Sequence, residues 1–192
     1  IDQLKENVDS LIVIPNERLK YVSDQKISFK NAFEIADNVL HQAVASISEL
    51  ITVPGLINLD FADVTSIMKG AGFAHMGVGS AAGKDKAEEA AKMAIQSPLL
   101  ESSINGAHGV ILSVIGSEDI ELDEIEQAAS MIQAAAHPDA HIIFGASISE
   151  DADDEIRVVV IATGFDNPPA TKQQQDRSAM FSNAKRTAQT FA

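Results

Sequence analysis

Two aspartates, Asp60 and Asp63, are the residues best placed to do chemistry in this sequence. They lie three residues apart at the start of a predicted helix, so their carboxylates share one helical face. A carboxylate pair in that place can orient and polarise a water molecule for attack. The same residues also suit a structural role, as an N-cap and a first-turn acid worth about 0.5–1 kcal/mol each. Spacing alone favours the structural role and leaves the catalytic one open.

A second set consists of Asn16, Phe33 and Asp37. Phe33 and Asp37 are four residues apart, so they share a face near the start of a long predicted helix. An aromatic ring beside a carboxylate can stack on guanine and accept hydrogen bonds from its N1–H and 2-amino groups. Spacing alone favours a simpler interpretation, in which Phe33 belongs to the core and Asp37 lies on the solvated side.

Three other patterns do not meet the requirements of the sites they suggest. The glycines of residues 77–84 precede Lys84, but their spacing is wrong for a phosphate loop and Asp85 stands where Ser or Thr would be needed. We therefore expect a glycine turn. The acidic residues 150–155 lack the glycine and glutamate of a calcium loop, and a solvated turn is expected. The five histidines show no ligand pair at helical spacing, so no metal site is predicted.

The elements that must position these residues alternate along the chain. Apolar residues recur every three or four positions over residues 28–51, which predicts a helix roughly 36 Å long. A short helix at residues 2–8 and a buried strand at residues 11–14 are predicted before it. Further helices are predicted at 60–69, 85–96 and 122–136, and strands at 74–79, 109–115, 141–146 and 156–163. Four strands with two helices on one face make residues 70–164 an α+β sandwich.

Composition excludes several classes of function. The chain has 192 residues, and 14 basic against 28 acidic side chains give a net charge of −14. This charge disfavours binding to nucleic acid or to anionic membranes. The absence of cysteine excludes disulfides and thiolate metal sites, and no apolar run approaches the ~20 residues that span a bilayer. Residues 166–192 contain Pro-Pro and Gln-Gln-Gln runs with little apolar periodicity, and we predict a flexible tail there.

The string TVPGLINLDFADV at residues 52–64 resembles the synergy loop of the bacterial cell-division family FtsZ, whose members are relatives of tubulin. Five further strings similar to that family occur in the family's order. They are LIVIPNERL at 11–19, AFEIADNVL at 32–40, KGAG at 69–72, SPLLE at 97–101 and VIATGF at 160–165. The resemblance covers residues 1–166 and is specific, because these strings are uncommon.

The resemblance implies a GTPase of bacterial cell division that polymerises head to tail in the cytoplasm, at the mid-cell ring. In that family a synergy loop enters the nucleotide pocket of the next subunit. Asp60 and Asp63 would then activate the attacking water, and Asn58 would contact the nucleotide in trans. The residues that would bind guanine within their own subunit are Asn16, Phe33 and Asp37. GTP, GDP and magnesium are expected in the complete protein, together with possible division adaptor proteins; neither nucleic acid nor direct membrane insertion is expected.

The sequence departs from the family in two places. No glycine-rich string of the type GGGTGTG occurs, and the last residues are not similar to the short apolar-basic peptide to which adaptors bind. We therefore expect four parts: a remnant of the nucleotide-binding domain (1–27), the central helix (28–52), the C-terminal synergy-loop domain (53–165) and the flexible tail (166–192). The chain alone is expected to bind no nucleotide and to be inactive.

The expected fold class is α/β. A long central helix precedes a two-layer α+β domain, which has a four-stranded, mainly parallel sheet with helices on one face. An alternative from another class of function is a stand-alone structural or interaction domain without nucleotide chemistry.

Overall fold

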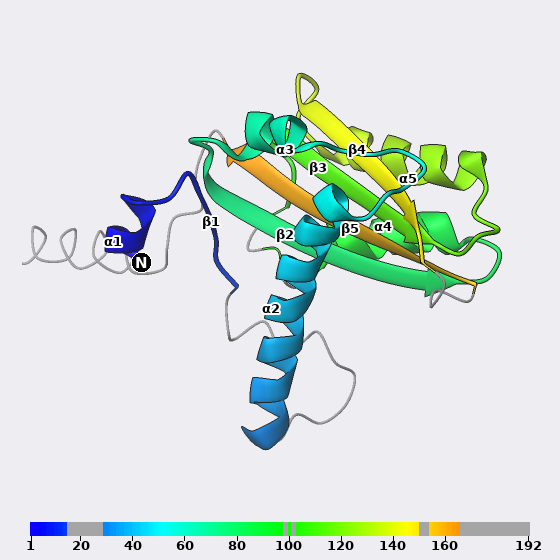
Figure 1. The fold of residues 1–192 in the computed structure, drawn as a ribbon, viewed down its shortest axis with the longest axis horizontal. Helices are drawn as coiled ribbons and strands as arrows, with labels where there is room; N and C mark the ends of the chain where they lie inside the picture. Colours follow the sequence, from blue (N-terminus) through cyan, green and yellow to red (C-terminus); the bar gives the residue numbers. More distant parts are fainter. Residues whose placement is uncertain (15–28, 98–99, 101–102, 150–153, 166–192) are drawn as a thin grey trace, which may run out of the picture.

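A computed structural model describes residues 1–14, 29–97, 100, 103–149 and 154–165 (Figure 1). Its elements, in chain order, are α1 (Asp2–Lys5), β1 (Ser10–Ile12), α2 (Phe29–Thr52), α3 (Phe61–Met68), β2 (Gly72–Ala82), α4 (Lys86–Ile95), β3 (Ala107–Gly116), α5 (Leu122–Ala135), β4 (His141–Ile148) and β5 (Glu155–Phe165). The predicted flexible tail and the start of the acidic turn lie outside the described residues.

Five strands form one sheet in the order β1-β2-β5-β3-β4. β1 is parallel to β2, and β3 is parallel to β4. β5 lies antiparallel between β2 and β3, so it alone opposes the other four strands. The mainly parallel α/β fold is thus confirmed. The sheet has one strand more than expected, because residues 10–12 pair with Gly72 and the two residues after it.

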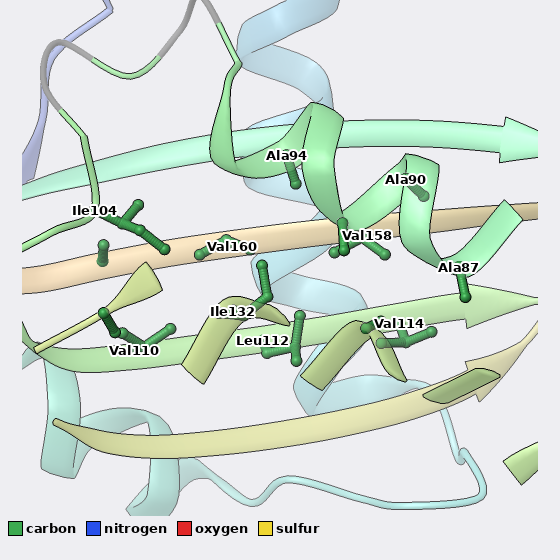
Figure 2. Packing of buried hydrophobic residues seen from close by; sticks show 14 of the residues in the cluster. Ala87, Ala90, Ala94, Ile104, Val110, Leu112, Val114, Ile132, Val158 and Val160 are labelled. Atoms are coloured by element: carbon green, nitrogen blue, oxygen red, sulfur yellow. The ribbon is translucent and has the colours of Figure 1, made fainter. Parts of the chain in front are cut away.

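The two helices α4 and α5 cover one face of the sheet, as predicted. Because side chains alternate between the faces of a strand, every second residue of β3 and β5 points toward these helices. The resulting core combines small residues of α4 with branched residues of α5 and of the strands (Figure 2). The residues labelled there include Ala87, Ala90, Ala94, Val110, Leu112, Val114, Ile132, Val158 and Val160.

Gly77 and Gly79 lie within β2, which confirms the strand predicted at residues 74–79 and restricts the glycine turn predicted for residues 77–84 to the residues after Ala82. A Cβ atom at Gly77 would stand 2.1 Å from the carbonyl oxygen of Ala94, and one at Gly79 would stand 2.1 Å from that of Ala90. Both glycines therefore let the backbone of α4 approach the sheet closely. The turn itself is at Gly83, where φ is +94° and a side chain would be strained.

The opposite face of the sheet carries α3 and the C-terminal end of α2. Val64 and Ile67 of α3 are buried there, together with Leu59 of the preceding loop. These side chains pack on residues of β2, β3 and β5, and Ile47 and Leu50 of α2 pack at the edge of the same cluster. The N-terminal part of α2 extends away from the sheet (Figure 1). No helix in the described ranges is both long and apolar enough to cross a membrane.

Candidate functional site

The loop between α2 and α3, residues 53–60, is held against β4 by its backbone. The N–H of Ile57 donates to the carbonyl oxygen of Ala146 at 3.1 Å, and the N–H of Ala146 donates to that of Ile57 at 3.0 Å. A Cβ atom at Gly55 would stand 2.3 Å from the carbonyl oxygen of Ala146, so only glycine permits this approach. With Leu59 buried in the core, the 53–60 loop has a fixed position on the sheet.

Asn58 is exposed and closes a turn within the 53–60 loop. Its Oδ1 atom accepts a hydrogen bond of 2.7 Å from the N–H of Gly55. This bond orients the amide with its oxygen toward the loop backbone. The NH2 group of Asn58 takes no part in this bond.

Asp60 and Asp63 form a reciprocal capping box at the start of α3. Asp60 Oδ1 accepts from the N–H of Asp63 at 2.9 Å, and Asp63 Oδ2 accepts from the N–H of Asp60 at 3.0 Å. The structural role expected from the sequence is therefore present. Each of these bonds engages one oxygen of a carboxylate and fixes the side chain. The other oxygen of each carboxylate is not used by the capping box, so the pair can also bind a water molecule.

The surface beside this pair is open and partly apolar. A hollow of about 830 Å³ is lined by Asp60, Phe61, Ala62, Thr65, Ser66 and Lys69. The Phe61 side chain is 72% exposed although it is directly adjacent to Asp60. Phe61 therefore leaves an aromatic surface open beside the Asp60 carboxylate.

The residues predicted to bind guanine lie elsewhere. Phe33 and Asp37 are exposed on the N-terminal half of α2, and Asn16 lies outside the described residues. Phe33 is 62% exposed, so the simpler interpretation that placed it in the core is wrong for this chain. The 20 residues from Phe33 to Thr52, the end of α2, span roughly 28 Å. The structure therefore does not bring Phe33 and Asp37 together with Asp60 and Asp63.

Three histidines of the described residues pack against other rings, whereas His41 and His141 are exposed. His75 is buried, and its ring meets the edge of the Phe165 ring with centroids 4.7 Å apart. The rings of His108 and His137 are in contact, with centroids 4.2 Å apart. Within the described residues, no group of three or more His, Cys, Asp or Glu side chains is arranged to hold a metal ion.

Lys86 is a buried charge that the sequence reasoning did not identify. Its Nζ lies 2.7 Å from Asp154 Oδ1 and 3.7 Å from Glu124 Oε1. These two ion pairs join α4 to the β4–β5 turn and to α5. The hydrogen bond from Lys86 holds the pKa of Asp154 below its ordinary value of 3.8. The same bond raises the pKa of Lys86 above 10.5, although burial opposes this shift. This network connects the N-terminal ends of α4 and α5 to the β4–β5 turn.

Comparison with known proteins gives one consistent result. The family described as FtsZ family, C-terminal domain, matches residues 72–166. FtsZ of M. jannaschii, solved as an empty dimer, is 42% identical with a TM-score of 0.81, over 85% of this chain and 47% of that one. A mutant of the same protein is 41% identical with a TM-score of 0.81, over 85% of this chain and 49% of that one.

A more distant likeness concerns the fold alone. A GTPγS-form protofilament of TubZ from Bacillus thuringiensis serovar israelensis is 13% identical, with a TM-score of 0.66, over 96% of this chain and 49% of that one. This chain therefore spans about half the length of the proteins it matches. The family match and the M. jannaschii structures together show that the chain belongs to the FtsZ/tubulin family and carries the C-terminal domain of FtsZ.

Proposed function

We propose that this chain is the loop-bearing part of a filament-forming GTPase of bacterial cell division. In this proposal the 53–60 loop and the start of α3 complete the GTPase site of the adjacent subunit. The observation that supports it is the capping box, which fixes the side chains of the exposed Asp60 and the half-buried Asp63 relative to each other. The exposed Phe61 beside the pair suits a contact with that partner.

GTP hydrolysis needs an in-line water molecule and stabilisation of the phosphates, but little covalent chemistry by the protein. The carboxylate oxygens of Asp60 and Asp63 that the capping box leaves unused would orient and polarise this water. Asn58, whose oxygen is engaged by the N–H of Gly55, would contact the nucleotide through its NH2 group. The phosphates and magnesium would be held by the nucleotide-binding half of the neighbouring subunit. Hydrolysis would therefore occur only after subunits have assembled.

Such a contact joins the loop side of one subunit to the nucleotide side of the next. A heterologous contact of this kind does not close on itself, so it builds filaments. Loss of the terminal phosphate would then weaken the contact that promoted hydrolysis. These filaments would form the division ring at mid-cell in the cytoplasm, where adaptor proteins bind them.

The guanine site would belong to the same subunit as α2 but would also require an upstream half. Phe33 and Asp37, with Asn16, would hold the guanine, and the exposed Leu40 and Val44 of α2 would be covered by that half. The isolated 192-residue chain is therefore expected neither to bind GTP appreciably nor to hydrolyse it. Measurable GTP turnover by the chain alone would contradict this part of the proposal.

The proposal is tested by Asp60→Ala and Asp63→Ala in the complete protein. We expect GTP binding to persist, while turnover per assembled subunit falls about a hundredfold or more, as for loss of a water-activating group. Asp123→Ala is the matched control, because Asp123 is an exposed acid in the first turn of α5, on the opposite face of the sheet. Parental turnover in both loop variants would instead support the stand-alone scaffold.

A further inference from the structure

Thr163 places a buried hydroxyl group directly beneath α3. Its side chain, on the central strand β5, is 1% exposed. Its Oγ1 atom lies 3.2 Å from the carbonyl oxygen of Ile67 and 3.3 Å from that of Gly109. A hydroxyl has one hydrogen to donate, so the two carbonyls share it. The group thereby links the end of α3 to the strand β3.

The carbonyl of Ile67 needs this donor because it belongs to the last turn of α3, where carbonyls have no partner within the helix. Its neighbours are satisfied by other groups: the Thr65 carbonyl accepts from the N–H of Lys69, and the Met68 carbonyl accepts from the hydroxyl of Ser10. Among the described contacts, Thr163 supplies the donor for Ile67.

The strand β3 is shaped to allow this contact. Gly109 is the register partner of Thr163 across the β3–β5 pair. A Cβ atom at Gly109 would stand 2.5 Å from Thr163 Oγ1 and 3.1 Å from Ile67 Cγ2. A larger residue at position 109 would therefore separate α3 from the sheet. The contact requires a glycine on one strand and a hydroxyl on the next.

We propose that Thr163 is a positioning residue for the GTPase reaction. Its hydroxyl fixes the position of α3 on the sheet. It thereby also fixes the position of Asp60 and Asp63 relative to the adjacent subunit. This inference rests on the proposed function.

The physical reason lies in the shortness of α3. A helix of eight residues is about 12 Å long and is not stable by itself, so its position depends on its contacts. The packing of Val64 and Ile67 is non-directional, whereas a hydrogen bond specifies both distance and angle. A shift at the end of a rigid two-turn helix is carried to its start. A misplacement of about 1 Å at a reaction centre can lower a rate by about a hundredfold.

The test uses Thr163→Val and Thr163→Ser in the complete protein. Valine keeps the shape of threonine without its hydroxyl, and serine keeps the hydroxyl. We expect the valine variant to bind GTP with parental affinity and to assemble, while turnover per assembled subunit falls about tenfold or more. The serine variant should retain most of the parental turnover. Counting only assembled subunits separates this effect from a loss of folded protein.

Parental turnover in filaments of the valine variant would overturn the inference, even if its melting temperature dropped. An equal loss in the serine variant would also overturn it, because the hydroxyl would then not be the cause. If the valine variant does not fold, Thr163→Cys replaces it, because a thiol is only a weak hydrogen-bond donor. The cysteine variant should then have a turnover between those of the serine variant and of a protein without the hydroxyl. Parental turnover in the cysteine variant would overturn the inference. Failure of the proposed function is recognised separately, by parental turnover in Asp63→Ala.

Discussion

Asp60 has two tasks in this account, and two substitutions separate them. Its Oδ1 caps α3 by accepting from the N–H of Asp63, and its charge would polarise the attacking water. Asp60→Asn keeps an oxygen acceptor at the cap but removes the negative charge. Asp60→Ala removes both. Asp60→Asn should therefore be about as stable as the parental protein, whereas Asp60→Ala should be less stable. GTP turnover should fall in both variants.

The expected sizes follow from the capping box. Loss of an N-cap side chain costs about 1 kcal/mol, which lowers the melting temperature of a chain of this size by about 2–4 °C. Asparagine caps about as well as aspartate, so Asp60→Asn should cost only a few tenths of a kcal/mol. Turnover should fall about a hundredfold or more in both variants, since each lacks the carboxylate.

Two assays read these effects independently. Urea unfolding of the 192-residue chain measures the free energy of unfolding, and phosphate release by the complete protein measures turnover. If Asp60→Asn hydrolyses GTP at the parental rate, the charge of Asp60 is not needed and the catalytic reasoning is refuted. If alanine and asparagine are equally stable, the cap does not contribute as described.

Three other changes have defined outcomes. Gly55→Ala should displace the 53–60 loop from Ala146, because a Cβ atom would stand 2.3 Å from its carbonyl oxygen; turnover should fall in the complete protein while GTP binding stays parental. The pKa of Asp154 in the folded state lies below 3.8, so the pairing of its carboxylate with Lys86 stabilises the fold above that pH, and this stabilisation is lost as the pH falls. Lys86→Met removes the pair. The free energy of unfolding, measured with urea, should then decrease less between neutral and acidic pH than it does in the parental chain. The 192-residue chain, added at equimolar amount to assembling complete protein, should cap filaments and lower light scattering; unchanged scattering would contradict this.

Local patterns predicted the helices well. The helix expected at residues 28–51 is observed at Phe29–Thr52, and the one expected at 60–69 is observed at Phe61–Met68. Periodicity of apolar residues and the capping residues are local properties, so both are readable from the sequence. The capping function of Asp60 and Asp63 was likewise predictable, because the two residues lie three positions apart.

Contacts between distant segments were not predictable. The pairing of β1 with β2 joins segments about 60 residues apart, and the Thr163–Ile67 bond joins residues 96 positions apart. The local sequence also does not show that α4 packs against Gly77 and Gly79 of β2. Lys86 was missed for the same reason, since one partner lies on another helix and the other in a distant turn. The catalytic role of Asn58, Asp60 and Asp63 stays a prediction, because the nucleotide on which they would act is proposed to be bound by the adjacent subunit.

The most direct test of the central claim supplies the loop and the nucleotide pocket on different molecules. Complete protein carrying both Asp60→Ala and Asp63→Ala should bind GTP without hydrolysing it. Addition of the 192-residue chain, which keeps both aspartates, should restore phosphate release in proportion to the amount added. The same chain with both aspartates replaced should restore none. Absence of phosphate release at concentrations where the chain is bound to the complete protein would contradict the claim that these aspartates act in trans.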